Sequence, residues 1–233
     1  DSLVGVVPCR TNDDILLSAS QGKCMRFRSN DVRLFKGRGS IGVRGIRLKN
    51  HDHVISISVL KHIEADTEVK SLYLKAASAK RRGESQNHIP EDEFEKMHTN
   101  DQFILTVSEN GFGKRTSAYE YRITKRGGQG IINIETSERN GPVIGSFPVL
   151  DSDHVMLVTN EGRIIRSPVN DIRIASRNTQ GVTLFSIGEG EKVVSVTALS
   201  GDMDDDSDTE EDMDGAFATG DKDVPVDEAL SIK

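Results

Sequence analysis

The feature that most constrains this chain is an internal repeat of about fifty residues. Three segments align with one another, at residues 14–60, 102–150 and 153–199. Each opens with a short apolar run that ends in a turn closed by Gly22, Gly111 or Gly162, and glycine suits such hairpin turns because they require positive φ. Four short strands in about fifty residues is the size of a propeller-type blade, so the repeat predicts an all-β array of four-stranded blades.

The later part of each repeat also follows one pattern. A Gly-rich turn ends at Gly42, Gly130 or Gly181, and the predicted third strands follow it as GVRGIRL, GIINIET and GVTLFSI. A polar turn then leads to a β-branched fourth strand, which we expect to begin at Val54, Val143 and Val193.

The spacing of the repeats reveals an insertion between the first two. The hairpin glycines Gly111 and Gly162 are 51 residues apart, whereas Gly22 and Gly111 are 89 apart. The excess lies in residues 61–101, where SLYLKAASAKRR, preceded by Asp66 and Thr67, predicts an amphipathic helix with a capping residue. Pro90 is expected to open a second short helix, EDEFEKMH.

The two ends of the chain differ from the repeats. DSLVGVVP resembles a fourth strand, so we expect the chain to be a piece of a larger protein. Residues 200–233 hold 13 of the 37 acidic residues and 2 of the 30 basic ones, which leaves this tail at −11 and residues 1–199 at +4. A basic body with an acidic tail is typical of nucleic-acid binding that the tail modulates. The expected organisation is residues 1–13 as the last strand of a preceding blade, 14–60 as a blade, 61–101 as a helical insertion, 102–152 and 153–199 as blades, and 200–233 as a disordered acidic tail.

Arginines recur in register across the repeats. Arginine occupies three equivalent positions, two counted from the hairpin glycines and a third that lies four residues before Gly42, Gly130 or Gly181, although the chain holds only 17 arginines among 233 residues. The first position is Arg26, Arg115 and Arg166; the second is Arg33, Arg122 and Arg173; the third is Arg38, Arg126 and Arg177. With basic neighbours added, the candidate DNA-binding residues are Arg26, Arg33, Lys36, Arg38, Arg44, Lys114, Arg115, Arg122, Lys125, Arg126, Arg163, Arg166, Arg173 and Arg177.

Phosphate binding is the chemistry that this register favours. The planar guanidinium stays charged and matches two phosphate oxygens at once, and evenly spaced positive charge suits a wrapped polyanion. Aromatics make up only 5% of the chain, which argues against base stacking and for sequence-independent binding of duplex DNA. An alternative is that a repeated arginine forms an ion pair between blades, as Asp31 and Asp171 hint for the second position.

Several motifs, in order, closely resemble the C-terminal domain of the DNA gyrase A subunit. They are GKCMRF, GVRGIRL, NGFGKRT, ERNGPVIG and SRNTQGV, and the resemblance covers residues 1–60 and 102–199. It implies a six-bladed β-pinwheel, of which three blades are present, with strands shared between blades and DNA wrapped around a basic rim. It also implies a bacterial type II topoisomerase, an isomerase, that introduces negative supercoils with ATP and Mg²⁺. The implied partners are double-stranded DNA, the rest of the gyrase A subunit and the gyrase B subunit, which together form an A2B2 assembly. The implied location is the cytoplasm, at the nucleoid.

The chain departs from the family pattern in two ways. The family's Gln-Arg-Arg-Gly-Gly-Lys-Gly box belongs to a first blade, whereas the similar segment 125–130 lies in a later repeat, so we do not transfer the box's role to it. The family's nucleophilic tyrosine has no counterpart, because Tyr73, Tyr119 and Tyr121 are better explained by a helix surface and by blade packing. We expect no catalytic residues, no metal site and no cofactor in this chain.

Two other functions remain open. The related domain of topoisomerase IV would wrap DNA less, and a propeller-like scaffold for protein interaction would present apolar and aromatic anchors instead of arginines. No apolar run is long enough for a membrane span, and the unpaired pattern of Cys9 and Cys24 favours a reduced cytoplasm.

Overall fold

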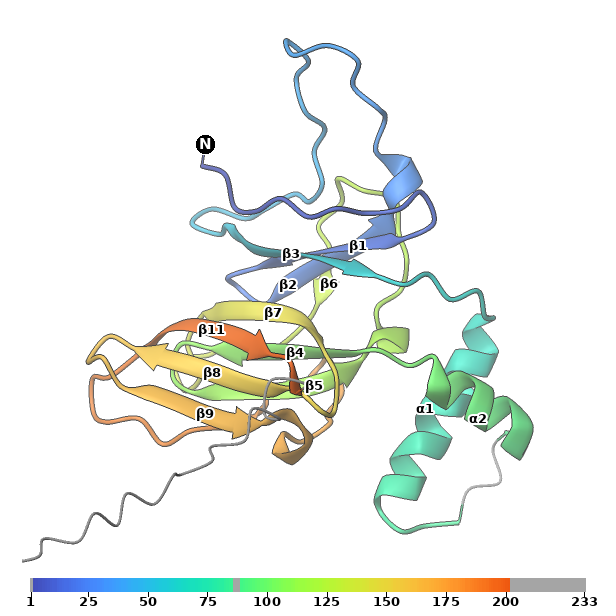
Figure 1. The fold of residues 1–233 in the computed structure, drawn as a ribbon, viewed down its shortest axis with the longest axis vertical. Helices are drawn as coiled ribbons and strands as arrows, with labels where there is room; N and C mark the ends of the chain where they lie inside the picture. Colours follow the sequence, from blue (N-terminus) through green and yellow to red (C-terminus); the bar gives the residue numbers. More distant parts are fainter. Residues whose placement is uncertain (1, 86–88, 202–233) are drawn as a thin grey trace, which may run out of the picture. The chain divides into compact units, whose positions relative to one another are not determined.

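The computed structural model of the chain describes residues 2–85 and 89–201. The predicted acidic tail therefore lies outside the described residues, apart from residues 200 and 201. Three antiparallel sheets and a helical insertion make up the described chain (Figure 1). The first repeat forms β1 (Asp14–Ala19), β2 (Lys23–Arg28), η1 (Ser29–Asp31) and β3 (Val54–Leu60). The second repeat forms β4 (Phe103–Ser108), β5 (Phe112–Ser117), η2 (Ala118–Glu120), β6 (Ile131–Ile132) and β7 (Val143–Val149). The third repeat forms β8 (His154–Thr159), β9 (Ile164–Pro168), η3 (Val169–Asp171), β10 (Val182–Thr183) and β11 (Val193–Leu199).

Two of the three sheets take a strand from the repeat that follows. The strand orders are β3-β1-β2-β6, β10-β5-β4-β7 and β11-β8-β9. Thus β6 of the second repeat pairs with β2 of the first, Cys24 opposite Ile131, and β10 of the third repeat pairs with β5 of the second, Val182 opposite Gly113. The all-β blade architecture is confirmed, and so is the sharing of strands between blades.

Three details of the expected strands are wrong. The third strand of each repeat does not complete its own blade, because in the second and third repeats it pairs with the blade before it. No described blade precedes the first repeat, and its corresponding segment, residues 42–48, forms no strand. Residues 2–8 also form no strand, although Gly5 lies close to Ile57 of β3. The loop after η1 projects away from its blade in Figure 1, and its Leu34 is 93% exposed. The equivalent Ile123 and Ile174 instead bridge to Arg26 and Arg115 of the preceding repeats.

The hairpin glycines do more than permit a tight turn. Gly22 and Gly111 both have positive φ, at 78° and 75°. A Cβ at Gly22 would lie 2.2 Å from the carbonyl oxygen of Ile134, and one at Gly111 would lie 2.7 Å from that of Phe185. Each of these two turns therefore packs directly against the following repeat, where only glycine leaves room for the neighbouring backbone.

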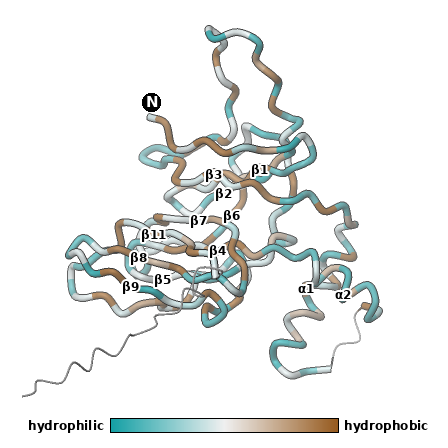
Figure 2. The backbone as a smooth tube through the Cα atoms, in the orientation of Figure 1, coloured by the Kyte–Doolittle hydropathy of each residue, from teal (hydrophilic) through white to brown (hydrophobic). Residues whose placement is uncertain are grey.

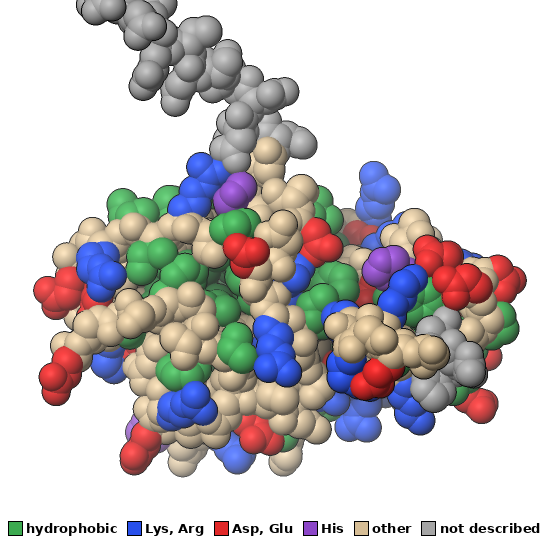
Figure 3. Space-filling view, turned by 90° about the horizontal axis from the view of Figure 1, so that it is seen from below, with side chains coloured by type: hydrophobic (Ala, Val, Ile, Leu, Met, Phe, Trp, Pro, Cys, Tyr) green, Lys and Arg blue, Asp and Glu red, His purple; other side chains and the backbone are tan. Residues whose placement is uncertain are grey.

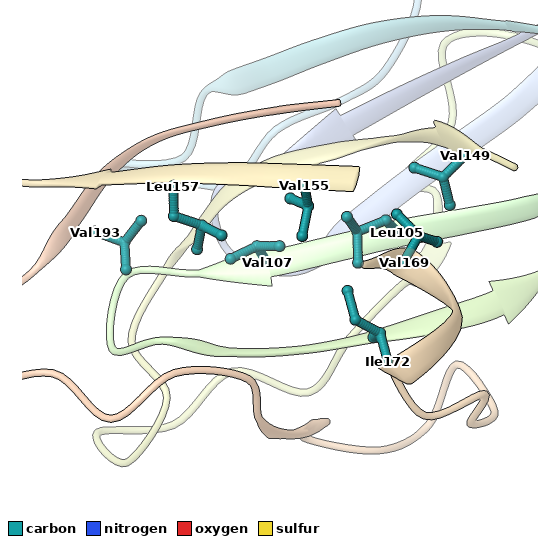
Figure 4. Close-up of a cluster of buried hydrophobic side chains, with 8 residues drawn as sticks. All are labelled: Leu105, Val107, Val149, Val155, Leu157, Val169, Ile172 and Val193. Atoms are coloured by element: carbon teal, nitrogen blue, oxygen red, sulfur yellow. The ribbon is translucent and has the colours of Figure 1, made fainter. Parts of the chain in front are cut away.

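Two of the apolar clusters lie between neighbouring blades. Leu105 and Val107 of β4 pack with Val155 and Leu157 of β8, and Val193 closes one end of this cluster (Figure 4). A second cluster joins the first two repeats through Leu16, Cys24, Leu60, Ile104, Ala118 and Tyr121. Along the backbone, hydrophobic stretches alternate with hydrophilic ones (Figure 2). Because neighbouring blades share a core, each one is stabilised by the next.

The insertion forms the two helices that the sequence predicts, α1 (Thr67–Arg81) and α2 (Glu91–Thr99). Asp66 stands at the N-cap of α1, but its side chain accepts no capping hydrogen bond. Tyr73 is not on a helix surface as expected; it is 1% exposed and packs edge-on against Tyr119 of η2. This contact anchors the insertion on the second blade. Neither helix, nor any other in the described chain, has the length and apolar character of a bilayer span.

Candidate nucleic-acid interface

The first arginine position links each of the first two repeats to the next. Arg26 donates from Nε and Nη2 to the Asp14 carboxylate at 3.0 and 2.7 Å, and from Nη1 to the carbonyl of Ala118 in the second repeat at 2.7 Å. Arg115 repeats this contact one blade later, donating to the carbonyls of Ile172 at 2.7 Å and Asn170 at 3.0 Å. Both side chains are buried.

This burial corrects the expectation that every arginine of the register lies on the surface. Arg26 and Arg115 are each 5% exposed, and their donors are directed at carbonyls and carboxylates of the protein itself. A guanidinium so engaged is not available to a phosphate. Arg166, the third member of this position, is exposed on β9.

The third position links each of the later repeats to the one before it. Arg126 donates from Nε to the carbonyl of Asp31 at 2.9 Å and from Nη1 to that of Arg44 at 3.2 Å. Arg177 makes the equivalent contacts one blade later, to the carbonyls of Glu120 at 2.8 Å and Ile132 at 2.5 Å. Both remain partly exposed, and Arg38 is exposed. Bridging between blades thus occurs through arginine and backbone carbonyls, not through the predicted Asp31 and Asp171 side chains.

The second position is the one that remains on the surface in every repeat. Arg33, Arg122 and Arg173 are all exposed. Arg33 stacks over the Phe35 ring at 4.7 Å. Within residues 2–85 and 89–201, none of the three side chains forms a hydrogen bond or ion pair, and neither Asp31 nor Asp171 pairs with them. Three charges at equivalent points of successive blades are therefore left uncompensated.

The remaining candidates divide in the same way. Lys36, Arg44 and Lys125 are outside the core, and exposed Arg163 forms an ion pair with Glu191 at 2.7 Å. Lys114 is the exception, because it is completely buried. Its Nζ donates to the carbonyls of Ser176 at 2.5 Å and Arg177 at 2.7 Å, and burial lowers its pKa to about 8. The repeats do carry a signal for this burial, since the equivalent residues, Met25 and Ile165, are apolar, and the charge of Lys114 concealed it.

A groove of about 890 Å³ adjoins the second arginine position. One wall is α1, and the other is formed by η2 and by the segments that carry Arg122 and Arg173. The basic side chains that α1 contributes are Lys70, Lys75 and Arg81. Residue-by-residue charge would have flagged them, but the insertion as a whole is acidic, with 7 basic and 9 acidic residues. In Figure 3, Lys and Arg side chains occur over both the blades and the insertion.

The tyrosines have structural roles in the described chain. Tyr121 is 1% exposed and donates to Asn133 Oδ1 at 2.7 Å, inside a polar layer with Thr106 and Ser146. Tyr73 donates to Asp101 Oδ2 at 3.0 Å. Burial raises the pKa of both phenols, which makes them poorer nucleophiles at neutral pH.

Comparisons with known proteins agree with this architecture. A family model described as "DNA gyrase C-terminal domain, beta-propeller" matches residues 13–61, 102–149 and 153–200. The DNA gyrase A subunit of Rickettsia bellii is 45% identical over 226 residues, which are 91% of this chain and 25% of that protein. The DNA gyrase A subunit of Salmonella typhimurium is 35% identical over 224 residues, 96% of this chain and 21% of that protein. The chain thus spans about a quarter of the length of such relatives.

Solved structures show the same fold. A DNA gyrase A C-terminal domain aligns with a TM-score of 0.59 at 21% identity, covering 80% of this chain and 50% of that one. The C-terminal domain of a DNA topoisomerase IV aligns with a TM-score of 0.60 at 19% identity, covering 82% and 48%. At this identity the structures support the fold alone. The matched family segments leave residues 62–101, and hence both helices, outside the family pattern.

Proposed function

Because the chain belongs to the DNA gyrase C-terminal domain family, we propose that it binds duplex DNA without sequence preference and wraps it along its blades. The observation that carries this proposal is the exposure of Arg33, Arg122 and Arg173 at one repeated position. Exposed arginines without a hydrogen-bonding partner attract phosphates, and their repetition along successive blades suits a continuous polyanion. Lys36, Arg38, Arg44, Lys125, Arg126, Arg163, Arg166 and Arg177 add positive charge to the proposed surface. Arg26, Arg115 and Lys114 are left out because they are buried.

In the whole protein, we propose that this domain serves a bacterial type II topoisomerase. The gyrase B subunit, together with the rest of the gyrase A subunit, would supply DNA cleavage and the use of ATP and Mg²⁺, in an A2B2 assembly at the nucleoid in the cytoplasm. Wrapping by this domain would present a neighbouring DNA segment for strand passage, and so support negative supercoiling. The described residues themselves would bind and bend DNA, with no chemical step of their own.

The test removes the second arginine position. In the full chain, the triple variant Arg33→Ala, Arg122→Ala, Arg173→Ala should fold normally, because these side chains are exposed. Fluorescence anisotropy with a labelled duplex should show weaker binding, and the slope of log affinity against log salt should fall by about 3, near one unit per lost phosphate contact. The matched control is Lys61→Ala, Lys80→Ala, Arg82→Ala, which removes three exposed charges elsewhere. Equal affinities and slopes for the two triples would refute a rim built on the second position.

A topoisomerase IV domain is the second candidate, because the two structural likenesses have nearly equal TM-scores, 0.60 and 0.59. Identities of 45% and 35% to gyrase A subunits favour gyrase. A supercoiling assay on the complete enzyme separates the two. Net introduction of negative supercoils supports gyrase, and relaxation or decatenation alone supports topoisomerase IV.

We further propose that the acidic tail competes with DNA for the basic blades. Its 13 acidic residues against 2 basic ones support this role. Deleting residues 200–233 should tighten duplex binding at low salt, and the difference should shrink as salt rises because screening weakens the competition. Unchanged affinity at low salt would remove the tail from the mechanism.

A further inference from the structure

The two helices of the insertion carry opposite charge. Helix α1 holds four basic residues and one acidic residue, a charge of +3, whereas α2 holds one lysine and four acidic residues, a charge of −3. The overall charge of the insertion therefore conceals a strongly basic helix. Two cations at its C-terminal end are engaged within the insertion: Lys80 pairs with Glu95 at 3.5 Å, and Arg82, just beyond α1, pairs with Glu84 at 2.7 Å.

The other basic side chains of α1 line the groove between this helix and the blades, which we call the α1 groove. Lys70, Lys75 and Arg81 occupy its helical wall, and Arg122 and Arg173 belong to the opposite side. In the part of the chain that the structure describes, none of these five side chains makes a hydrogen bond or an ion pair. Five unpaired cations therefore line one depression.

The acidic residues of the α1 groove do not balance these cations. The Asp101 carboxylate accepts hydrogen bonds from Ser117 at 2.7 Å and from Tyr73 at 3.0 Å. The Glu120 carboxylate accepts the backbone N–H of Arg177 at 3.0 Å. Burial lowers the pKa of Lys70 and of Arg81, so desolvation disfavours the charged form of both in the protein alone. An anion in the α1 groove would offset that cost.

We propose that α1 is a second DNA-contact element, in which Lys70, Lys75 and Arg81 bind the phosphate backbone of the duplex that lies on Arg122 and Arg173. The inference rests on the proposed function and extends it to a segment outside the family pattern. DNA is the occupant because Arg122 and Arg173 belong both to the α1 groove and to the repeated second position. A DNA strand bound at that position would continue into the α1 groove and contact positively charged side chains throughout. The insertion thereby widens the binding surface on one side of the second and third blades.

The test compares two charge-matched triples in the full chain. The groove variant is Lys70→Gln, Lys75→Gln, Arg81→Gln, and its control is Lys61→Gln, Lys80→Gln, Arg82→Gln, which removes three charges of the same insertion outside the α1 groove. With a labelled duplex of about 40 base pairs, the groove variant should lower the salt slope by about 3 and weaken binding at least about tenfold at low salt. The control should match the wild type. Circular dichroism and thermal unfolding verify that both variants fold.

A crosslinking readout is independent of affinity. Cys9→Ser removes the exposed cysteine, after which Ser71→Cys places a thiol in the α1 groove and Ser85→Cys places one outside it. A photoactivatable group on residue 71 should crosslink to the duplex, and the same group on residue 85 should not.

Each other outcome overturns the inference in a distinguishable way. If the groove variant binds like its control while the Arg33, Arg122 and Arg173 triple binds weakly, α1 is not a contact element and the proposed function stands. If the wild type binds no duplex, both fail together. If the groove variant binds like the wild type in the full chain and more weakly than the wild type only once residues 200–233 are deleted from both, the tail occupies the α1 groove instead of DNA. The same conclusion follows if the groove variant binds duplex more tightly than the wild type in the full chain.

Discussion

The buried arginine at the first position gives the sharpest prediction for stability. Arg26→Ala removes three hydrogen bonds of 2.7–3.0 Å, two to the Asp14 carboxylate and one to the carbonyl of Ala118. Asp14 is 0% exposed and keeps only His62 at 3.1 Å and a distant Arg28 at 4.0 Å. The substitution therefore leaves a buried carboxylate underpaired and removes the donor from the first blade to the Ala118 carbonyl, which keeps only the backbone N–H of Tyr121 at 3.2 Å.

The expected loss follows from these two defects. Breaking one side of a buried ion pair costs roughly 3–5 kcal/mol, and the residual His62 contact favours the lower half of that range. We expect about 3–4 kcal/mol, or a fall in Tm of about 6–16 °C for a domain of this size. Arg166→Ala is the matched control, since it removes the same register position from an exposed site and should cost about 1 kcal/mol or less.

Urea unfolding followed by circular dichroism measures both variants. The double variant Arg26→Met, Asp14→Leu completes the test, because removing both charges should cost less than removing the arginine alone. If Arg26→Ala loses no more stability than Arg166→Ala, the contact between blades does not contribute as the geometry requires. If the double variant is less stable than Arg26→Ala, the underpaired carboxylate is not the cause of the lost stability.

Three further predictions concern packing, pH and charge. Gly22→Ala should cost more than about 3 kcal/mol, since its Cβ would lie 2.2 Å from the Ile134 carbonyl oxygen. Gly162→Ala, also at positive φ but with no described atom within 4 Å of its Cβ, should cost about 1 kcal/mol in urea unfolding; equal losses would contradict packing as the cause. Burial raises the pKa of Asp101 from 3.8 to about 6, so its stabilising contribution is complete below pH 3.8 and is lost as pH rises through 6. The wild type should therefore lose up to about 3 kcal/mol relative to Asp101→Asn between about pH 4 and 7, and parallel pH profiles would refute this. Lys114→Met should leave the salt slope of duplex binding unchanged, because the buried ammonium donates its hydrogen bonds to backbone carbonyls. A fall of the slope by about one unit would show that Lys114 contacts a DNA phosphate.

Local features of the fold were predictable from sequence patterns alone, whereas the sharing of strands between repeats was expected only from the family resemblance, and the residues that pair were not predictable. Hairpin glycines and β-branched runs depend on short-range geometry, so the predicted starts of the fourth strands at Val54, Val143 and Val193 are confirmed. The helices of the insertion follow from periodicity and from Pro90 for the same reason. The partner of Ile131 is Cys24, more than one hundred residues away, and no local pattern specifies such a pairing. Likewise, Tyr73 is buried only because Tyr119 of a distant turn packs against it.

The arginine register shows most clearly where sequence reasoning reaches its limit. A repeated fold places equivalent residues in equivalent surroundings, whether those surroundings are solvent or the next blade. Carbonyls at the end of a 3₁₀ turn and phosphate oxygens are both acceptors that suit a guanidinium, so arginine recurs for either purpose. Arg26 and Arg122 are thus indistinguishable by spacing, although one is 5% exposed and the other lies on the surface. Affinity for duplex DNA and its salt dependence should accordingly fall when charge is removed at the second position or from α1. Removing the buried arginines of the first position should change stability alone.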